Sequence, residues 1–145
     1  MTDLVAQRNI GALIALVPAI PPESSSGGTI NGTALDRFAH GLPNSCVLHQ
    51  MVGAISGAPT ATSVQTKLQH SQDDVTWSDF QINGTTQATA AIAAANTDGS
   101  LGIDLTTAYR FIRAEMVVTF TGGTTPAALV AADLVLGGER SLPAL

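Results

Sequence analysis

The sequence predicts an all-β protein built as a single antiparallel sandwich or barrel. Apolar and polar residues alternate with a period of two through several segments. Turn-forming residues separate these segments at the spacing of roughly 8–12 residues that is typical of sandwiches and barrels. The length of 145 residues corresponds to one domain. We assign residues 29–145 to a β-sandwich body and residues 1–28 to an N-terminal arm and linker.

The segment before the body is strongly apolar and then rich in proline, serine and glycine. Residues 10–20 read IGALIALVPAI, and residues 18–28 read PAIPPESSSGG. A secretory signal is disfavoured because Asp3 precedes the apolar run, no Ala-x-Ala site follows it, and prolines interrupt it. We interpret residues 9–17 as a strand or arm docked on its own body or on another subunit, and residues 18–28 as an extended linker. The residues expected to bind a partner here are Leu13, Ile14, Leu16, Val17 and Ile20.

The clearest strand lies at residues 109–121, with one face for the core and one mixed face. Residues 128–136 alternate similarly after the Gly122-Gly123 turn, so the two segments predict a hairpin. The core face should contain Ile112, Ala114, Met116, Val118 and Phe120. Further strands are expected at residues 33–38, 46–55, 63–70 and 75–80, whereas residues 89–95 are either a strand of small side chains or one helical turn.

Composition limits the classes of partner. Charged residues make up 12% of the chain against about 25% in average soluble proteins. The net charge of -5 gives no attraction for nucleic-acid phosphates. The mean hydropathy is +0.27, although no apolar run is long enough to span a membrane. The apolar excess therefore favours burial against another protein, and we expect neither nucleic acid nor membrane as a partner.

Signatures of catalysis and cofactor binding are absent from the sequence. It contains no glycine-rich phosphate loop, no Gly-x-Ser-x-Gly and no His-Glu-x-x-His. We interpret Cys46 as a buried small hydrophobe, and Asp73-Asp74 and the Asn-Gly pairs at 31–32 and 83–84 as turns. Metal-ligand spacing is lacking for the histidines, which are His40, His49 and His70. We therefore expect a non-enzymatic protein without metal or cofactor.

One local pattern resembles small structural proteins of tailed bacteriophages. Residues 64–80 read VQTKLQHSQDDVTWSDF, and residues 109–113 read YRFIR before a final strand-turn-strand. The resemblance covers about half of the chain, from Val64 onward, and its motifs encode strand packing. It implies a jelly-roll-like β-sandwich and a role in the virion, such as capsid decoration or cement. Trp77 is expected to anchor the core between the sheets.

The leading hypothesis is a non-enzymatic decoration protein that binds the major capsid protein on the outer surface of a phage head, after synthesis in the host cytoplasm. Self-association as a dimer or trimer is also expected. Phe111, Arg113 and Glu115 form a second candidate partner-binding patch. An alternative is a tail or fibre module that binds carbohydrate or a receptor, which the aromatic content of 4% disfavours. A hydrolase using Asp73, Asp74 or Asp79 is a third hypothesis.

Overall fold

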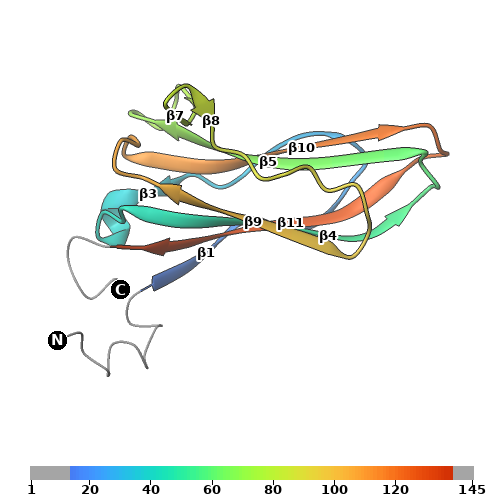
Figure 1. Cartoon of the computed structure of the whole chain (residues 1–145), viewed down its shortest axis with the longest axis horizontal. Coiled ribbons are helices and arrows are strands. Elements are labelled where there is room, and N and C mark those ends of the chain that lie inside the picture. Colours follow the sequence, from blue (N-terminus) through green and yellow to red (C-terminus); the bar gives the residue numbers. More distant parts are fainter. Residues whose placement is uncertain (1–13, 139–145) are drawn as a thin grey trace.

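Two antiparallel sheets face each other in the computed structural model, which describes residues 14–138 (Figure 1). Sheet A consists, in order, of β1 (Ile14–Ser25), β11 (Ala127–Gly137), β4 (Ser45–Ser56) and β9 (Thr97–Asp104). Sheet B consists of β2 (Gly28–Asn31), β10 (Phe111–Thr121), β5 (Ala61–Ser71) and β6 (Ser78–Asp79), with β3 (Leu35–Asp36) also paired to β10. The all-β sandwich predicted from the sequence is confirmed.

The chain passes repeatedly between the two sheets, and this order gives a jelly-roll connectivity. In sheet A, the first and last described strands, β1 and β11, are neighbours, and β4 and β9 follow. In sheet B, β2 and β10 are neighbours in the same way, and β5 and β6 follow. A short hairpin, β7 (Gln81–Ile82) with β8 (Thr85–Thr86), stands outside both sheets. Its turn is the predicted Asn83-Gly84 pair, whose φ values of 52° and 78° are those a two-residue hairpin turn requires.

The predicted hairpin between residues 109–121 and 128–136 is wrong, because β10 lies in sheet B and β11 in sheet A. β10 pairs with β5 along its whole length, whereas β11 pairs with β4 and β1. The connecting loop crosses between the layers beside the β4–β5 loop, where the Thr124 N–H donates to Gly57 O at 2.8 Å (Figure 1). Two strands show the same alternation whether they pair in one sheet or lie in two facing sheets that bury their apolar faces against each other. The alternation therefore did not distinguish a hairpin from the observed arrangement.

The linker expected at residues 18–28 is instead part of the body. Residues up to Ser25 belong to β1, which forms one edge of sheet A against β11. Prolines occupy the edge at positions 18, 21 and 22, and the register shifts twice between Pro18 and Glu23. Proline is tolerated there because one side of an edge strand makes no ladder hydrogen bonds. The apolar inner residues of the strand, rather than its proline content, decide that it docks.

The predicted Asn31-Gly32 turn is also different in the structure, because Gly32 lies where the two sheets approach closely. Its N–H donates to Ala114 O at 2.7 Å, and the next N–H, of Thr33, donates to Ala19 O at 3.0 Å. A Cβ on Gly32 would lie 2.6 Å from Ala19 O. This glycine is therefore required by close packing of backbone and not by a hairpin.

The core lies between the inner faces of the sheets and follows the predicted alternation. Ile112, Ala114, Met116 and Val118 are buried as expected, and Phe120 packs against them. The aromatic anchor is Phe80, which is 1% exposed. Trp77, predicted to fill this role, is only half-buried.

Two segments are less regular than expected. Residues 89–95 form neither a strand nor a helical turn, and Ile92 makes an isolated bridge to Val64. The side chain of Gln50 fixes this segment by donating to Ala90 O and accepting from Thr66 Oγ1, each at 2.8 Å. Residues 33–38 contain β3 followed by a 3-10 helix at Arg37–His40, and only the end of residues 75–80 is a strand.

Candidate interaction surfaces

One row of residues across the outer face of sheet A is apolar, beside a polar row of Asp133, His49 and Ser100. Leu16 of β1 is paired with Val135 of β11, which is paired with Val47 of β4. These three side chains form a row that ends at Gly102 of β9. Leu16 is 66% exposed and Leu129, further along β11, is 52% exposed. Contiguous exposed apolar residues on a small protein indicate a binding surface more often than isolated ones do.

Sheet A contains acidic residues and no Lys or Arg. Its carboxylates are Glu23, Asp98, Asp104 and Asp133. The Lys and Arg residues within positions 14–138 lie instead in or beside sheet B: Arg37, Lys67, Arg110 and Arg113. The outer face of sheet A therefore combines an apolar centre with negative charge.

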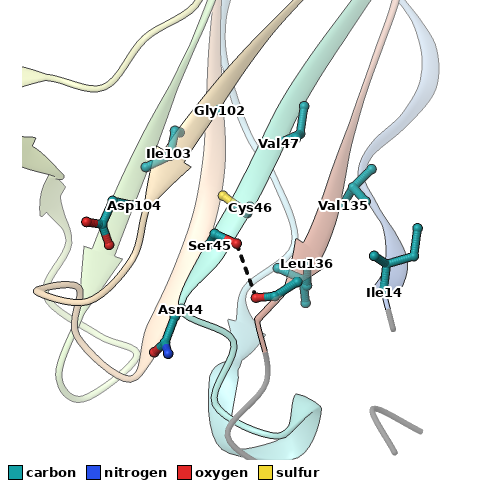
Figure 2. Close-up of a pocket in the computed structure, with 11 residues that line it drawn as sticks. Ile14, Asn44, Ser45, Cys46, Val47, Gly102, Ile103, Asp104, Val135 and Leu136 are labelled. Carbon is teal, nitrogen blue, oxygen red and sulfur yellow. Dashed lines mark hydrogen bonds between the residues drawn. The ribbon is translucent and has the colours of Figure 1, made fainter. Parts of the chain in front are cut away.

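A hollow of about 450 Å³ lies at the end of this face (Figure 2). Figure 2 shows Ile14 and Asp104 on opposite sides of the hollow, with strand β4 and its residues Ser45 and Val47 between them. The Ser45 hydroxyl donates to Gly137 O at 3.3 Å across the floor. A smaller depression of about 170 Å³ lies near the other end, beside Leu129. The face is thus contoured rather than flat.

The outer face of sheet B is mostly polar, with Val117 as an exposed aliphatic residue, and its charged side chains are paired. The Lys67 ammonium lies 2.9 Å from Asp79 and 3.1 Å from Glu115. These contacts raise the pKa of Lys67, and hydrogen bonds from Lys67 and then Gln69 lower the pKa of Asp79. Arg113 donates to Gln69 Oε1 at 2.9 Å and its guanidinium lies 4.4 Å from the centre of the Trp77 ring. The polar groups of this face therefore bind one another.

The predicted patch of Phe111, Arg113 and Glu115 lies on this polar face of β10. Within this patch, Arg113 contacts Gln69 and Trp77, and Glu115 pairs with Lys67. Phe111 is half-buried at the end of the strand, under the guanidinium of Arg110. Partner binding by this patch stays a prediction.

Arg110 and the aromatic rings of Phe38 and Phe111 form a cluster next to this patch. This guanidinium makes two hydrogen bonds to Asp36, at 2.7 and 2.9 Å, and stacks 4.5 Å from the Phe38 ring. The hydrogen bond from Arg110 lowers the pKa of Asp36. The charge of Arg110 is therefore neutralised within the chain.

The predicted apolar residues of the N-terminal segment divide between two faces of β1. Leu16 projects outward, and Ile14 lines the hollow. Val17 packs against the core, and Ile20 is 1% exposed. The core of this body, and not a partner, therefore covers Ile20. Leu13 lies outside the described residues.

Sequence reasoning missed Val47, Met51, Leu129 and Val135 as surface residues. The available signal was that both alternating positions are apolar in residues 46–55 and 128–136. A strand with one solvated face normally alternates apolar and polar residues. A strand that is apolar on both faces is therefore expected to have its outer face covered as well. This pattern in residues 46–55 and 128–136 could have identified sheet A as a candidate contact surface.

The candidate chemical groups are dispersed or engaged in structural contacts. Within residues 14–138, no three His, Cys, Asp or Glu side chains are grouped in a way that could hold a metal ion. Burial raises the pKa of the Cys46 thiol to about 12, so it behaves as the expected small hydrophobe. Asp73 accepts from the N–H groups of Val75 and Thr76 at 2.9 and 2.8 Å, which confirms the predicted turn. His49 binds Asp98, and His70 stacks on Tyr109.

No helix in the described part of the chain is long and apolar enough to cross a bilayer.

No model of a known protein family matches the chain, and no curated protein matches it. Among solved structures, the SPBc2 prophage-derived protein YomS is 13% identical, with 86% of this chain and 93% of that chain covered and a TM-score of 0.46. The capsid of Helicobacter pylori bacteriophage KHP30 is 12% identical, with coverages of 86% and 87% and a TM-score of 0.42. T=1 particles derived from infectious bursal virus are 16% identical, with coverages of 90% and 32% and a TM-score of 0.48. The fold assigned to this chain rests on its own strand order.

Proposed function

We propose that this protein is a structural component of a tailed-phage virion that binds the major capsid protein lattice as a decoration or cement protein. The row formed by Leu16, Val135 and Val47 on the outer face of sheet A carries this proposal. The resemblance of residues 64–80 and 109–113 to tailed-phage structural proteins supports the choice of partner. The role requires binding and no catalytic group.

The size of the face suits a stable protein contact. With strands about 4.8 Å apart and residues about 3.3 Å apart, a four-stranded sheet ten residues long presents roughly 600 Å² before side-chain relief is counted. A standard interface buries about 800 Å² on each partner. Sheet A is therefore large enough to supply most of one side of such an interface.

Repetition on a shell would strengthen a contact of this kind. Apolar burial contributes about 25 cal/mol per Å², much of which is offset by the loss of rotational and translational freedom on binding. On a capsid the same contact recurs at every equivalent position, and a copy that bridges two subunits also resists their separation. A modest interface on each copy can therefore stabilise the whole shell.

The experiment uses empty shells assembled from the major capsid protein of the phage that encodes this chain. Val47→Lys places an ammonium group in the apolar row, where its desolvation against a bound partner costs several kcal/mol. We expect co-sedimentation with shells to weaken by at least about 100-fold. Thr119→Lys, on an exposed outer position of central strand β10, is the matched control and should bind as the native protein does.

Two results would contradict the proposal. One is native protein that does not co-sediment with shells at micromolar concentration. The other is equal binding by both lysine variants, which would exclude sheet A as the contact face. Urea denaturation of both variants ensures that any loss of binding is not a loss of folding, because lysine at an exposed position changes stability by about 0.5 kcal/mol or less.

The carbohydrate-binding alternative gains no support from the aromatic residues. A sugar normally stacks on an exposed ring face, but the Arg113 guanidinium covers one face of Trp77. The Tyr109 ring is stacked on His70, with centroids 4.2 Å apart.

Self-association as a dimer or trimer stays a prediction, which sedimentation velocity of the isolated protein would test.

A further inference from the structure

We propose that the hollow at the end of sheet A receives an apolar side chain of the major capsid protein, projecting from a surface bordered by lysine or arginine. This inference rests on the proposed function and specifies the chemistry of its partner. The hollow continues the apolar row, since Val47, Val135 and Gly102 line it. It is therefore part of the same contact face.

Glycine at position 102 is not required by the backbone. Its φ is not in the left-handed region, and a Cβ built on it would have no atom within 4 Å. Glycine in the middle of a strand is unfavourable because it loses more backbone entropy on folding and packs no side chain. The local consequence of this glycine is that the space above β9 remains open.

Gly137 on β11 behaves in the same way. A Cβ there would make only ordinary contacts, at 3.7 Å from Ser45 Oγ and 3.9 Å from the Cγ2 atom of Ile14. A side chain at either glycine would occupy the hollow without straining the strand. The hollow thus depends on two positions at which the fold itself would accept larger residues.

Polar groups around the hollow indicate what should surround the inserted side chain. Asp104 lies at one side and is acidic. Asn44 also lines the hollow, and its Oδ1 atom is buried without a hydrogen-bond donor among residues 14–138. A buried acceptor without a donor costs about 1–3 kcal/mol. Asn44 Oδ1 is enclosed by the chain itself, whereas the exposed carboxylate of Asp104 would be complemented by a partner that brings positive charge.

Charge complementarity favours the capsid protein over a second copy of this chain. If two copies joined through sheet A, the carboxylates of both copies would come together, and sheet A of neither copy contains a Lys or Arg to pair with them. On sheet B, Lys67 and Arg110 already pair with carboxylates of their own chain. Like charges placed across an interface disfavour association. The occupant is therefore a different protein with cationic residues around an apolar projection.

The test fills the hollow by Gly102→Val and compares it with Thr119→Val on sheet B. Gly102→Val adds apolar volume at an outward position, whereas Thr119→Val makes an outward position of β10 apolar with little change in size. We expect Gly102→Val to weaken binding to capsid-protein shells at least tenfold, while its urea midpoint stays equal to that of the native protein or rises. Thr119→Val should leave shell binding unchanged.

A second arm tests the charged border. We expect Asp104→Asn to weaken shell binding threefold to tenfold and to reduce the loss of affinity between 50 and 500 mM salt. Asparagine can still accept the 2.9 Å hydrogen bond that the Thr106 N–H donates to Asp104, so the turn is retained. Unchanged affinity and salt dependence in this variant would contradict a basic border.

The remaining outcomes separate this inference from the proposed function. If native protein binds shells and Gly102→Val binds equally well, the hollow is not an anchor although the function stands. If native protein does not bind shells, the proposed function fails and this inference with it. A lowered urea midpoint in Gly102→Val would show that residues of the same chain fill the hollow. A native dimer dissociated by the substitution would assign the hollow to a second copy, and either result overturns the inference.

Discussion

The outer faces of the two sheets carry different kinds of side chain. On sheet B, charged side chains alternate with the core and pair with one another, as Lys67 does with Asp79 and Glu115. On sheet A, the corresponding outward positions carry aliphatic side chains such as Val47 and Val135. The aliphatic residues of sheet A are not needed on a face that stays in contact with water. The charged residues of sheet B are already paired within the chain, so they offer little attraction to a partner. This contrast is the reason that we propose sheet A, and not sheet B, as the contact face.

The largest expected effect tests whether β1 belongs to sheet A, as the comparison requires. Ile20→Ala should lower the free energy of unfolding by about 2–5 kcal/mol, because it leaves a cavity in the core. Leu16→Ala, on the outer face of the same strand, should change it by about 0.5 kcal/mol or less. Urea denaturation monitored by circular dichroism measures both. Similar small effects for the two variants would mean that β1 is not docked in solution.

A smaller effect sharpens the contrast between paired and unpaired charge. Lys67→Met leaves Asp79 and Glu115 close together without their cation, so we expect a loss of about 1–2 kcal/mol, between the values for surface and buried pairs. Asp133→Asn on sheet A should be neutral within about 0.5 kcal/mol. Urea midpoints provide the measurement. Equal stability of the Lys67→Met and native proteins would show that the ion pairs of sheet B contribute nothing.

The smallest effect concerns acid stability. Because the pKa of Asp79 is lowered in the folded protein, its contribution to stability is complete above its unfolded pKa and is lost as the pH falls through the folded value. The stability difference between native protein and Lys67→Met should therefore be largest at neutral pH and shrink below about pH 4. Denaturation at a series of pH values measures this difference. A gap that stays constant down to pH 2 would contradict the assigned ion pair.

Sequence reasoning located β4, β5, β10 and β11 because their inner faces alternate, whereas it predicted no strand at β9 (Thr97–Asp104). It placed β10 and β11 close to their observed limits and identified the buried side of β10. It failed where the same pattern permits two partners, as in the expected hairpin of these strands. It also failed where proline suggested a linker, because edge strands tolerate proline at positions that central strands do not.

The candidate surface was only partly predictable. Leu16 was identified by its apolar character, but so was Ile20, and the sequence did not separate the exposed residue from the buried one. The register shift between Pro18 and Ile20 alters which residues of β1 face inward. A β-bulge changes the alternation that sequence analysis relies on. Val47 and Val135 became recognisable as a surface only when pairing placed them beside Leu16.

The sequence alone was enough to establish that this chain forms strands, which residues of the regularly alternating strands enter the core, and that its surface is poor in charge. Only the tertiary structure decided which strands share a sheet, and therefore that the outward aliphatic residues gather on sheet A while the described Lys and Arg residues gather on or beside sheet B. The physical reason is that a period of two specifies the inner and outer faces within one strand. The choice of neighbouring strand depends on backbone hydrogen bonds and on the closure of the core between residues far apart in the chain.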